Sequence, residues 1–308
     1  MPPSPLITVD QLEAAFDRAT IVDASWIYGP FNHAGIDVRR RYAQAHIRGS
    51  WFLDLAALSD PARKYDARVD VLTPPRPGVI RTALAHAGAI WSSLVVVTDM
   101  DGGCTTAPFA RHALLEAGFL DVRLLAGGTP AWCAAGGELT DAGPRYLGAD
   151  LVSDDAARAP ARAGGSVFAT HAELMRALDD PAGAQIVDSR AVASNQGVLP
   201  ADYEGLEVPA SAFVPSTGVV EELGAGLQFK SAGKLGDVLR AAGIDPGRPM
   251  ITTCYFGVGA SVVATALEIA GFGSARVHAG SLVEYAARNR LIPRHPPAGV
   301  GQRPSGTI

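Results

Sequence analysis

The sequence has few cysteines, and none is placed as a structural pair would require. Its 308 residues include three, Cys104, Cys133 and Cys254, and no C-x-x-C motif. It therefore predicts neither a disulfide framework nor a structural zinc site. We expect a cytoplasmic protein, kept reduced, in which a single thiol performs chemistry.

Long apolar runs and an excess of positive charge are also missing. The longest apolar stretches, such as Leu94–Thr98 and Ser261–Leu267, fall far short of the roughly 20 residues that cross a membrane. The amino-terminal residues show no basic stretch followed by an apolar run, so we expect no signal peptide. The formal net charge of −5 disfavours a broad nucleic-acid surface. We therefore expect neither a membrane nor a nucleic acid as partner.

The chain does contain enough apolar sequence for two folded domains. Hydrophobic residues make up 48% of it and charged residues 19%, a balance typical of globular rather than disordered proteins. At roughly 150 residues per domain, the length predicts two domains.

An internal repeat indicates that the two domains are of one kind. Asp101–Trp132 aligns without a gap on Cys254–Tyr285. Earlier in each half, Ile21–Ser25 (IVDAS) matches Ile186–Arg190 (IVDSR). A period near half the chain is too long for a solenoid, so the chain consists of two copies of one domain. The aspartate that opens the first aligned segment stands opposite the cysteine that opens the second.

Each copy alternates short apolar runs with segments of helical apolar spacing. In the first copy, we expect a strand, a helix, a strand, a helix and a strand at Ile21–Asp23, Gly78–Ala87, Leu94–Thr98, Pro108–Ala117 and Val122–Leu125. In the second copy, we expect the same series at Ala184–Asp188, Gly233–Ala242, Pro249–Thr253, Ser261–Ala270 and Ala275–His278. This alternation predicts an α/β fold in which each copy is a parallel sheet with helices on both faces.

The two copies set the expected domain boundaries. We expect an N-terminal domain over residues 1–140 and a linker over 141–165, which is rich in Ala, Gly, Asp and Arg. A C-terminal domain over 166–292 follows, and the Pro- and Gly-rich segment 293–308 is expected to be a tail.

Cys254 lies where a parallel sheet places its ligands, at the carboxyl end of an expected strand. The loop after it consists of Tyr255, Phe256, Gly257, Val258, Gly259 and Ala260. Two glycines allow the backbone to turn several N–H groups towards one centre, and a helix begins after them. We expect this environment to lower the pKa of the Cys254 thiol and make it a nucleophile. A buried structural cysteine before a tight turn is the alternative.

Six motifs carry a resemblance to a known family. They are IVDASW at Ile21–Trp26, AHIRGSWFLDL at Ala45–Leu55, LLAGGTPAW at Leu124–Trp132, IVDSR at Ile186–Arg190, TCYFGVGAS at Thr253–Ser261 and HAGSLVEY at His278–Tyr285. Through them the chain resembles, over nearly its whole length, the tandem rhodanese-type thiosulfate and 3-mercaptopyruvate sulfurtransferases. The resemblance implies two rhodanese-like domains, of which the first is non-catalytic, with Asp101 at the cysteine position, and the second is catalytic.

The resemblance also implies a mechanism. The Cys254 thiolate takes a sulfur atom from a small-molecule donor, and the backbone N–H groups of residues 255–260 hold the resulting persulfide. The sulfur then passes to cyanide or a thiol, and no metal or organic cofactor takes part. Asp37 and His46 match family positions that border the active site. His46 would orient a substrate or transfer a proton there, unless it only caps a strand.

The chain departs from its family around the thiol. Thiosulfate-type loops carry Arg and Lys where this sequence has Tyr255 and Phe256, and mercaptopyruvate-type loops carry a Thr where it has Gly259. Two arginines that hold the substrate carboxylate in mercaptopyruvate enzymes correspond to Ser194 and Tyr203. Anionic donors are normally held by arginines, so these departures predict a pocket that is less cationic and more aromatic, unless the two aromatic residues plug the domain interface instead.

Several other residues have a structural interpretation. Cys104 is expected to be a small loop or core residue, with a second reactive thiol as the alternative, and Cys133 is expected to be structural. Asp23 and Asp188 end buried strands, where we expect them to accept backbone hydrogen bonds. We expect an arginine that follows, Arg190, to pair with a carboxylate of the same region.

Other functions need other features. Phosphatases and arsenate reductases that share this fold need a C-x5-R loop, whereas the sixth residue after Cys254 is Ala260, so that interpretation fails for lack of an oxyanion-binding arginine. A binding or regulatory protein that has lost turnover, or a persulfide carrier that delivers sulfur to a partner protein, is the remaining alternative to a small-molecule sulfurtransferase.

Overall fold

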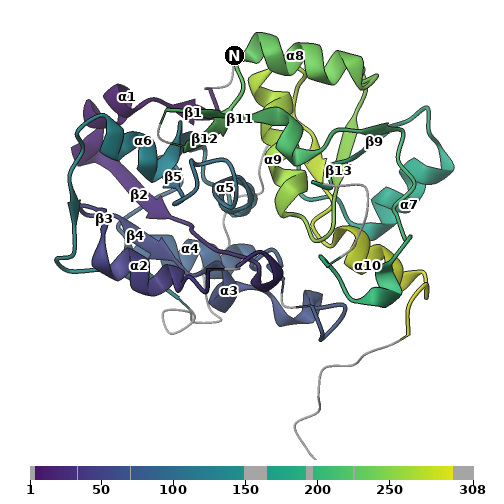
Figure 1. Ribbon diagram of the computed structural model, residues 1–308, viewed down its shortest axis with the longest axis horizontal. Helices are drawn as coiled ribbons and strands as arrows, with labels where there is room; N and C mark the ends of the chain where they lie inside the picture. The colour runs from purple at the N-terminus through teal and green to yellow at the C-terminus, as the bar shows by residue number, and fades with distance from the viewer. Residues whose placement is uncertain are drawn as a thin grey trace, which may run out of the picture.

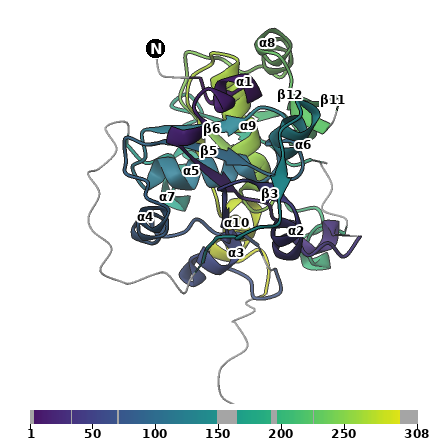
Figure 2. The same ribbon diagram turned by 90° about the vertical axis from the view of Figure 1, so that its left-hand side faces the viewer.

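The computed structural model describes residues 4–32, 34–69, 71–148, 165–191, 197–224 and 226–293. The predicted segment 293–308 lies almost entirely outside this range. The described chain forms two lobes that lie side by side in Figure 1, the N-terminal lobe on the left and the C-terminal lobe on the right. Figure 2 looks from the side of the N-terminal lobe.

The N-terminal lobe contains a sheet of six strands in which every neighbouring pair is parallel. In spatial order the strands are β1 (Leu6–Ile7), β6 (Asp121–Leu125), β5 (Leu94–Thr98), β2 (Ala19–Asp23), β4 (Trp51–Leu53) and β8 (Tyr146–Leu147). Strand β8 lies inside the segment expected to be a linker, so the N-terminal lobe continues at least to Leu147. The rest of that segment, residues 149–164, lies outside the described residues.

The C-terminal lobe contains a parallel sheet of four strands. In spatial order they are β10 (Ala212–Phe213), β9 (Gln185–Asp188), β13 (Met250–Thr253) and β14 (Arg276–Val277). Two antiparallel pairs were not predicted from the sequence. They are β3 (His46–Ile47) with β7 (Leu139–Thr140), and β11 (Val220–Leu223) with β12 (Gly226–Phe229).

Helices follow the strands in both lobes. The N-terminal lobe has α1 (Val9–Glu13), α2 (Val38–Gln44), α3 (Leu55–Leu58), α4 (Pro77–His86), α5 (Ala107–Glu116) and α6 (Gly128–Ala134). The C-terminal lobe has α7 (His171–Asp179), α8 (Ala232–Ala241), α9 (Val258–Ile269) and α10 (Ser281–Arg288). All ten predicted strands and helices are confirmed, and every one except Leu94–Thr98 has a shifted end. In the described part of the chain, every helix is too short or too polar to span a bilayer.

Alternating side chains of the strands face different cores. In β5, Val96 packs with residues of α1 and α6, whereas Val95 and Val97 face the centre of the molecule. In β9, Ile186 packs with residues of α7 and α10, whereas Val187 faces the centre. Helices therefore cover both faces of each sheet, as predicted, because a buried parallel strand is apolar on both sides.

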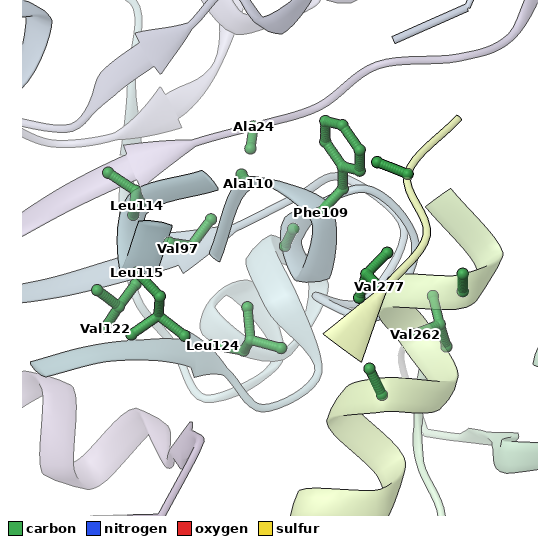
Figure 3. Close-up of a cluster of buried hydrophobic side chains, with 14 of the residues drawn as sticks. Ala24, Val97, Phe109, Ala110, Leu114, Leu115, Val122, Leu124, Val262 and Val277 are labelled. Atoms are coloured by element: carbon green, nitrogen blue, oxygen red, sulfur yellow. The ribbon is translucent and has the colours of Figure 1, made fainter. Parts of the chain in front are cut away.

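The central core joins the two lobes. Helices α4 and α5 from one lobe and α8 and α9 from the other contribute to it, and α5 packs directly on α9. Figure 3 shows residues of the N-terminal lobe, such as Phe109, in one cluster with Val262 and Val277 of the C-terminal lobe. An ion pair of 2.8 Å between Arg111 of α5 and Glu268 of α9 also crosses this interface. Helix α5 follows the loop after β5, and α9 follows the loop after β13. The two helices that meet here therefore occupy equivalent places in the two lobes.

Candidate active site

Cys254 is the first residue after β13, and it opens a four-residue loop, residues 254–257, that leads to α9. The loop turns at Gly257, whose φ of 99° is in the region that favours glycine. A Cβ atom at this position would lie 2.5 Å from the carbonyl oxygen of Ala279. The backbone of α10 fixes the loop from the other side, because the Leu282 amide donates to the Cys254 carbonyl oxygen at 3.1 Å. The tight turn predicted from the glycines is therefore present.

The loop directs hydrogen-bond donors at the cysteine sulfur. The Gly257 amide donates to Cys254 Sγ at 3.1 Å, and the amides of Phe256 and Ala260 also stabilise the thiolate. Cys254 itself is 4% exposed. Burial raises the pKa of the Cys254 thiol above its usual value, and the amides only oppose that rise. The prediction of a lowered pKa is therefore wrong for the substrate-free protein, because removing the thiolate from water outweighs the donors.

Ser281 is a site residue that the sequence analysis missed. Its hydroxyl oxygen accepts the Cys254 amide at 2.9 Å and lies 3.8 Å from Cys254 Sγ. The hydroxyl donates to the His278 carbonyl oxygen at 2.6 Å. Ser281 has a φ of 45°, a conformation that costs a non-glycine residue on the order of 1–3 kcal/mol. The aligned residue of the first copy is Gly128, whose φ is 58°. A glycine at the equivalent place indicates that the backbone of this position is constrained.

Cys254 lies in a cavity of about 470 Å³ between the lobes. The C-terminal lobe contributes all of the loop except Gly257 and Ala260, together with strand and helix residues behind it. The N-terminal lobe contributes Trp26, Ile27, Tyr28, Ile36, Asp101, Cys104, Thr105 and Thr106. Tyr255 and Phe256 thus line the cavity and also pack in a buried cluster that contains residues of both lobes, which combines the two interpretations of these residues.

One cation lies in the described lining of this cavity, and it is held by carboxylates. Arg190 Nη2 lies 2.7 Å from Asp188 Oδ2 and 3.5 Å from Glu207 Oε2. The predicted pairing of Arg190 with a nearby carboxylate is confirmed. Asp188 also accepts the Arg190 amide at 3.1 Å, and Asp23 accepts the Ser25 amide at 2.9 Å, which confirms the backbone hydrogen bonds expected of both aspartates.

The structure does not bring Asp37 and His46 to the described lining of the cavity. The Asp37 carboxylate is exposed and caps α2, where it accepts the Arg40 amide at 3.0 Å. The His46 ring is 2% exposed, its Nδ1 lies 2.9 Å from the Tyr42 carbonyl oxygen, and it stacks on the Tyr42 ring. Both side chains are held by local contacts within the N-terminal lobe, which the spacing of a motif does not reveal.

The two positions that correspond to substrate arginines give no cation either. Ser194 lies outside the described residues. Tyr203 is fully buried and does not line the described cavity. Its hydroxyl donates to Asp66 of the N-terminal lobe at 3.0 Å, and Arg68 binds the same carboxylate at 2.7 Å. Tyr203 therefore holds the lobes together.

The other cysteines differ in exposure. Cys104 is buried in the loop after β5 and lines the cavity of Cys254. Burial, with two nearby aspartates, raises the pKa of the Cys104 thiol, so it is a poor nucleophile. Cys133 is exposed, so the expectation that it serves packing is wrong. Among the described residues, no group of three or more His, Cys, Asp or Glu side chains could hold a metal ion.

The strand registers correct the position that corresponds to Cys254. Thr98 pairs with Asp23 in the first sheet, as Thr253 pairs with Asp188 in the second. The residue after Thr98 is Asp99, so Asp99 and not Asp101 occupies the place of Cys254. The ungapped alignment missed this because the first loop is longer than the second.

Comparisons with known proteins agree with this architecture. The sequence pattern of the Rhodanese-like domain family matches residues 8–135. The chain is 29% identical over 275 residues to a 3-mercaptopyruvate sulfurtransferase of Mus musculus, covering 87% of this chain and 85% of that protein. It is also 29% identical over 291 residues to a Mycobacterium tuberculosis protein provisionally named thiosulfate sulfurtransferase SseB, covering 92% and 94%.

Solved structures share the fold over both lobes. SseA from Escherichia coli superimposes with a TM-score of 0.69 at 24% identity. Its crystal structure was presented as an account of the "Rhodanese" fold and the catalytic mechanism of 3-mercaptopyruvate sulfotransferases. The match covers 91% of this chain and 99% of SseA. The Tum1 protein of Saccharomyces cerevisiae superimposes with a TM-score of 0.73 at 20% identity, covering 94% and 96%.

Proposed function

We propose that this chain is a tandem-domain rhodanese and that it is a sulfurtransferase, which forms a persulfide on Cys254. The relatives are named for two donors, 3-mercaptopyruvate and thiosulfate. In the proposed reaction, thiosulfate gives its outer sulfur to Cys254 as its sulfur–sulfur bond breaks, and it leaves as sulfite. With 3-mercaptopyruvate the carbon–sulfur bond breaks instead, the thiol proton of Cys254 passes to that carbon, and pyruvate leaves. Cyanide or a thiol then accepts the sulfur from Cys254. The reaction belongs to the sulfur-transferring class of transferases.

One observation carries the proposal: a nucleophilic atom lies at the focus of backbone donors inside a cavity. The Gly257 amide is 3.1 Å from Cys254 Sγ, and the cavity holds about 470 Å³. Donors aimed at the sulfur favour negative charge on it during attack and on the persulfide afterwards. Such donors are already oriented, so the reaction needs no reorganisation of the loop.

The raised pKa of Cys254 fixes how the proton must move. The thiol is protonated before a donor binds, because burial raises the pKa of Cys254. When Sγ forms its bond to the outer sulfur of thiosulfate and the sulfur–sulfur bond of the donor breaks, the thiol proton passes to the new persulfide or to the leaving sulfite. Atoms and charge balance without an oxidant, and the exchange is redox neutral.

Intact mass after incubation with thiosulfate or 3-mercaptopyruvate tests the proposal. We expect a gain of one sulfur, about 32 Da, which disappears in Cys254→Ser because the thiolate is the nucleophile. Cys104→Ser is the matched control, since Cys104 lines the same cavity, and it should keep the adduct. A folded protein with a titratable Cys254 that gains no sulfur from any donor would contradict the proposal.

Transfer to a protein partner, or binding without turnover, is the second candidate. A persulfide carrier must present its sulfur to the acceptor protein, whereas Cys254 is 4% exposed. The burial supports a small-molecule donor and acceptor. A Cys254 persulfide that small thiols and cyanide fail to discharge would favour the carrier.

We also propose that the protein works in the reducing cytoplasm. All three cysteines are free, and Cys133 is exposed, a state that an oxidising compartment does not preserve. Recovery of the protein from an oxidising compartment with Cys254 in a disulfide would contradict this location.

A further inference from the structure

The walls of the Cys254 cavity are mostly apolar. Three aromatic rings on its lining contact one another: the ring centroids of Tyr28 and Phe256 are 4.7 Å apart, and those of Trp26 and Phe256 are 6.3 Å apart. Aliphatic side chains complete these walls, namely Ile27, Ile36, Val220, Leu227, Val258 and Val262. Walls of this kind bind hydrocarbon or aromatic groups by the hydrophobic effect.

The charges in the described lining do not favour an anion. The only arginine or lysine among these residues is Arg190, whose guanidinium is bound to Asp188 at 2.7 Å. The only carboxylate is that of Asp101, and burial, with Asp99 nearby, raises the pKa of Asp101. A donor that carries oxyanions would lose water here without gaining a cation, and burying an unpaired charge is costly.

The size of the cavity also exceeds that of a small inorganic ion. Its volume of about 470 Å³ falls within the range of roughly 300–1,000 Å³ that is typical of pockets for drug-sized ligands. Such a volume has room for an organic group of several carbon atoms beside the reacting sulfur atoms.

We propose that the preferred donor is an organic hydropersulfide, R–S–SH, whose group R is apolar and uncharged. This inference rests on the proposed sulfurtransferase function and names its substrate class. Cys254 Sγ forms a bond to the outer sulfur of the donor, and the sulfur–sulfur bond of the donor breaks. The thiol proton of Cys254 passes to the leaving sulfur, which yields a Cys254 persulfide and R–SH. The apolar walls hold R, and the loop amides face the sulfur atoms.

A matched pair of donors tests the preference for R. Benzyl hydropersulfide and carboxymethyl hydropersulfide share the reacting group, but the first has an aromatic body and the second an anionic one. Rates of persulfide formation on the full-length protein are followed by intact mass, with thiosulfate as a third donor. Each hydropersulfide rate is divided by the rate of the same donor with N-acetylcysteine, which removes differences in intrinsic reactivity. We expect the normalised rate of the benzyl donor to be about 10- to 100-fold higher than that of the carboxymethyl donor, because an apolar pocket favours an apolar group over a charged one.

A substitution in the wall shows whether the cavity causes the preference. Ile36 is partly buried and holds its place through backbone contacts with Asn32, so an arginine side chain can extend from it into the cavity. Ile36→Arg should lower the ratio of the benzyl rate to the carboxymethyl rate about tenfold, because the cation attracts the carboxylate. Ile90→Arg is the control for added charge, since Ile90 is 59% exposed and lies outside this lining, and it should leave the ratio unchanged.

The outcomes separate this inference from the proposed function. Equal or faster normalised loading by the carboxymethyl donor, or an unchanged ratio in Ile36→Arg, would overturn the apolar donor while a persulfide on Cys254 still supports sulfur transfer. Absence of a Cys254 persulfide with all donors, in folded protein with a titratable thiol, would overturn both.

Discussion

The loops after β5 and β13 lie at equivalent places in the two lobes, yet they surround different groups. In the N-terminal lobe the Asp99 carboxylate accepts five backbone amides, from Asp101, Gly103, Thr105, Thr106 and Ala107, at 2.7 to 3.2 Å. In the C-terminal lobe the amides surround the Cys254 sulfur. A fixed carboxylate fills the anion site of the first loop permanently, whereas a thiol leaves the second able to hold a transferred sulfur.

The loop after β5 serves stability, whereas the loop after β13 serves chemistry. Asp99 is fully buried, and its hydrogen bonds tie a long loop to the strand before it. Cys254 is buried too, but burial raises its pKa, so its loop keeps a neutral group at the focus of donors suited to an anion. Groups held in an environment suited to another charge state are common at functional sites.

Removing the central group from each loop should have opposite consequences. Asp99→Ala leaves five amides without their acceptor, three of them buried and two partly buried, and should lower the free energy of unfolding by about 3–5 kcal/mol. Cys254→Ala removes one buried atom and should cost about 1 kcal/mol. Urea unfolding measures both. All four tryptophans, Trp26, Trp51, Trp91 and Trp132, lie in the N-terminal lobe, so their fluorescence reports on the lobe that holds Asp99.

Circular dichroism follows the unfolding of both lobes in the same samples. Unfolding of Asp99→Ala at the urea concentration of the wild type would show that the carboxylate does not hold the first loop. A loss in Cys254→Ala as large as that in Asp99→Ala would show that the two loops do not differ in kind.

The aspartates that end β2 and β9 form a second pair. Asp188 holds the buried Arg190, so Asp188→Asn should cost about 3–5 kcal/mol of stability. Burial raises the pKa of Asp23 to about 6. The stability that protonated Asp23 contributes to the fold is therefore fully present below the unfolded pKa of 3.8 and is lost as the pH rises through about 6. Between pH 4 and pH 8, the wild type should lose about 2–3 kcal/mol relative to Asp23→Asn. Denaturant unfolding at several pH values measures this difference.

The comparison of the wild type with Asp23→Asn at each pH isolates the contribution of this one carboxyl group. A parallel pH dependence of the wild type and Asp23→Asn would show that folding does not raise the pKa of Asp23.

Ser281 and Gly128 form the third pair, because each begins the helix that follows the third predicted strand of its copy. Ser281→Ala removes a hydroxyl that lowers the pKa of Cys254. We expect alkylation of Cys254 by iodoacetamide at pH 8 to slow about threefold to tenfold, because loss of this hydroxyl raises the pKa of the thiol and so lowers its thiolate fraction. The pH profile of alkylation measures it, and the inflection should move to higher pH.

Ser281→Gly copies the N-terminal lobe and separates strain from chemistry. It should slow alkylation as Ser281→Ala does, since both lack the hydroxyl, yet be more stable than Ser281→Ala by about 1 kcal/mol because glycine tolerates the positive φ. Alkylation of Ser281→Ala at the wild-type rate would show that the hydroxyl does not act on the sulfur.

The elements of the fold were predictable because their signals are local. Leu94–Thr98 was expected as a strand and is β5 without a shift, since a short apolar run with polar ends suits a buried parallel strand. The antiparallel pair β11 and β12 was not expected. Its strands carry Glu221, Glu222 and Gln228 with few buried side chains, so apolar periodicity gives little sign of it.

The site was predictable only in part. The place of Cys254 at a strand end follows from the repeat and its glycines, but the equivalence with Asp99 required the strand registers, because an ungapped alignment hides a difference in loop length. The family pattern suggested Asp37 and His46 for the cleft, whereas α2 and Tyr42 hold these side chains elsewhere. A motif specifies neighbours along the chain and not the direction of a side chain.

The sequence alone determined that the chain has two copies of an α/β domain and that a single thiol follows a strand in the second copy. Both are written in the order and periodicity of residues. Only the tertiary structure decided that the thiol is buried with a raised pKa and that Trp26 and Tyr28 of the other lobe wall its cavity. The burial and the electrostatic environment of one atom depend on many residues that are distant in the sequence, and only folding brings those residues together.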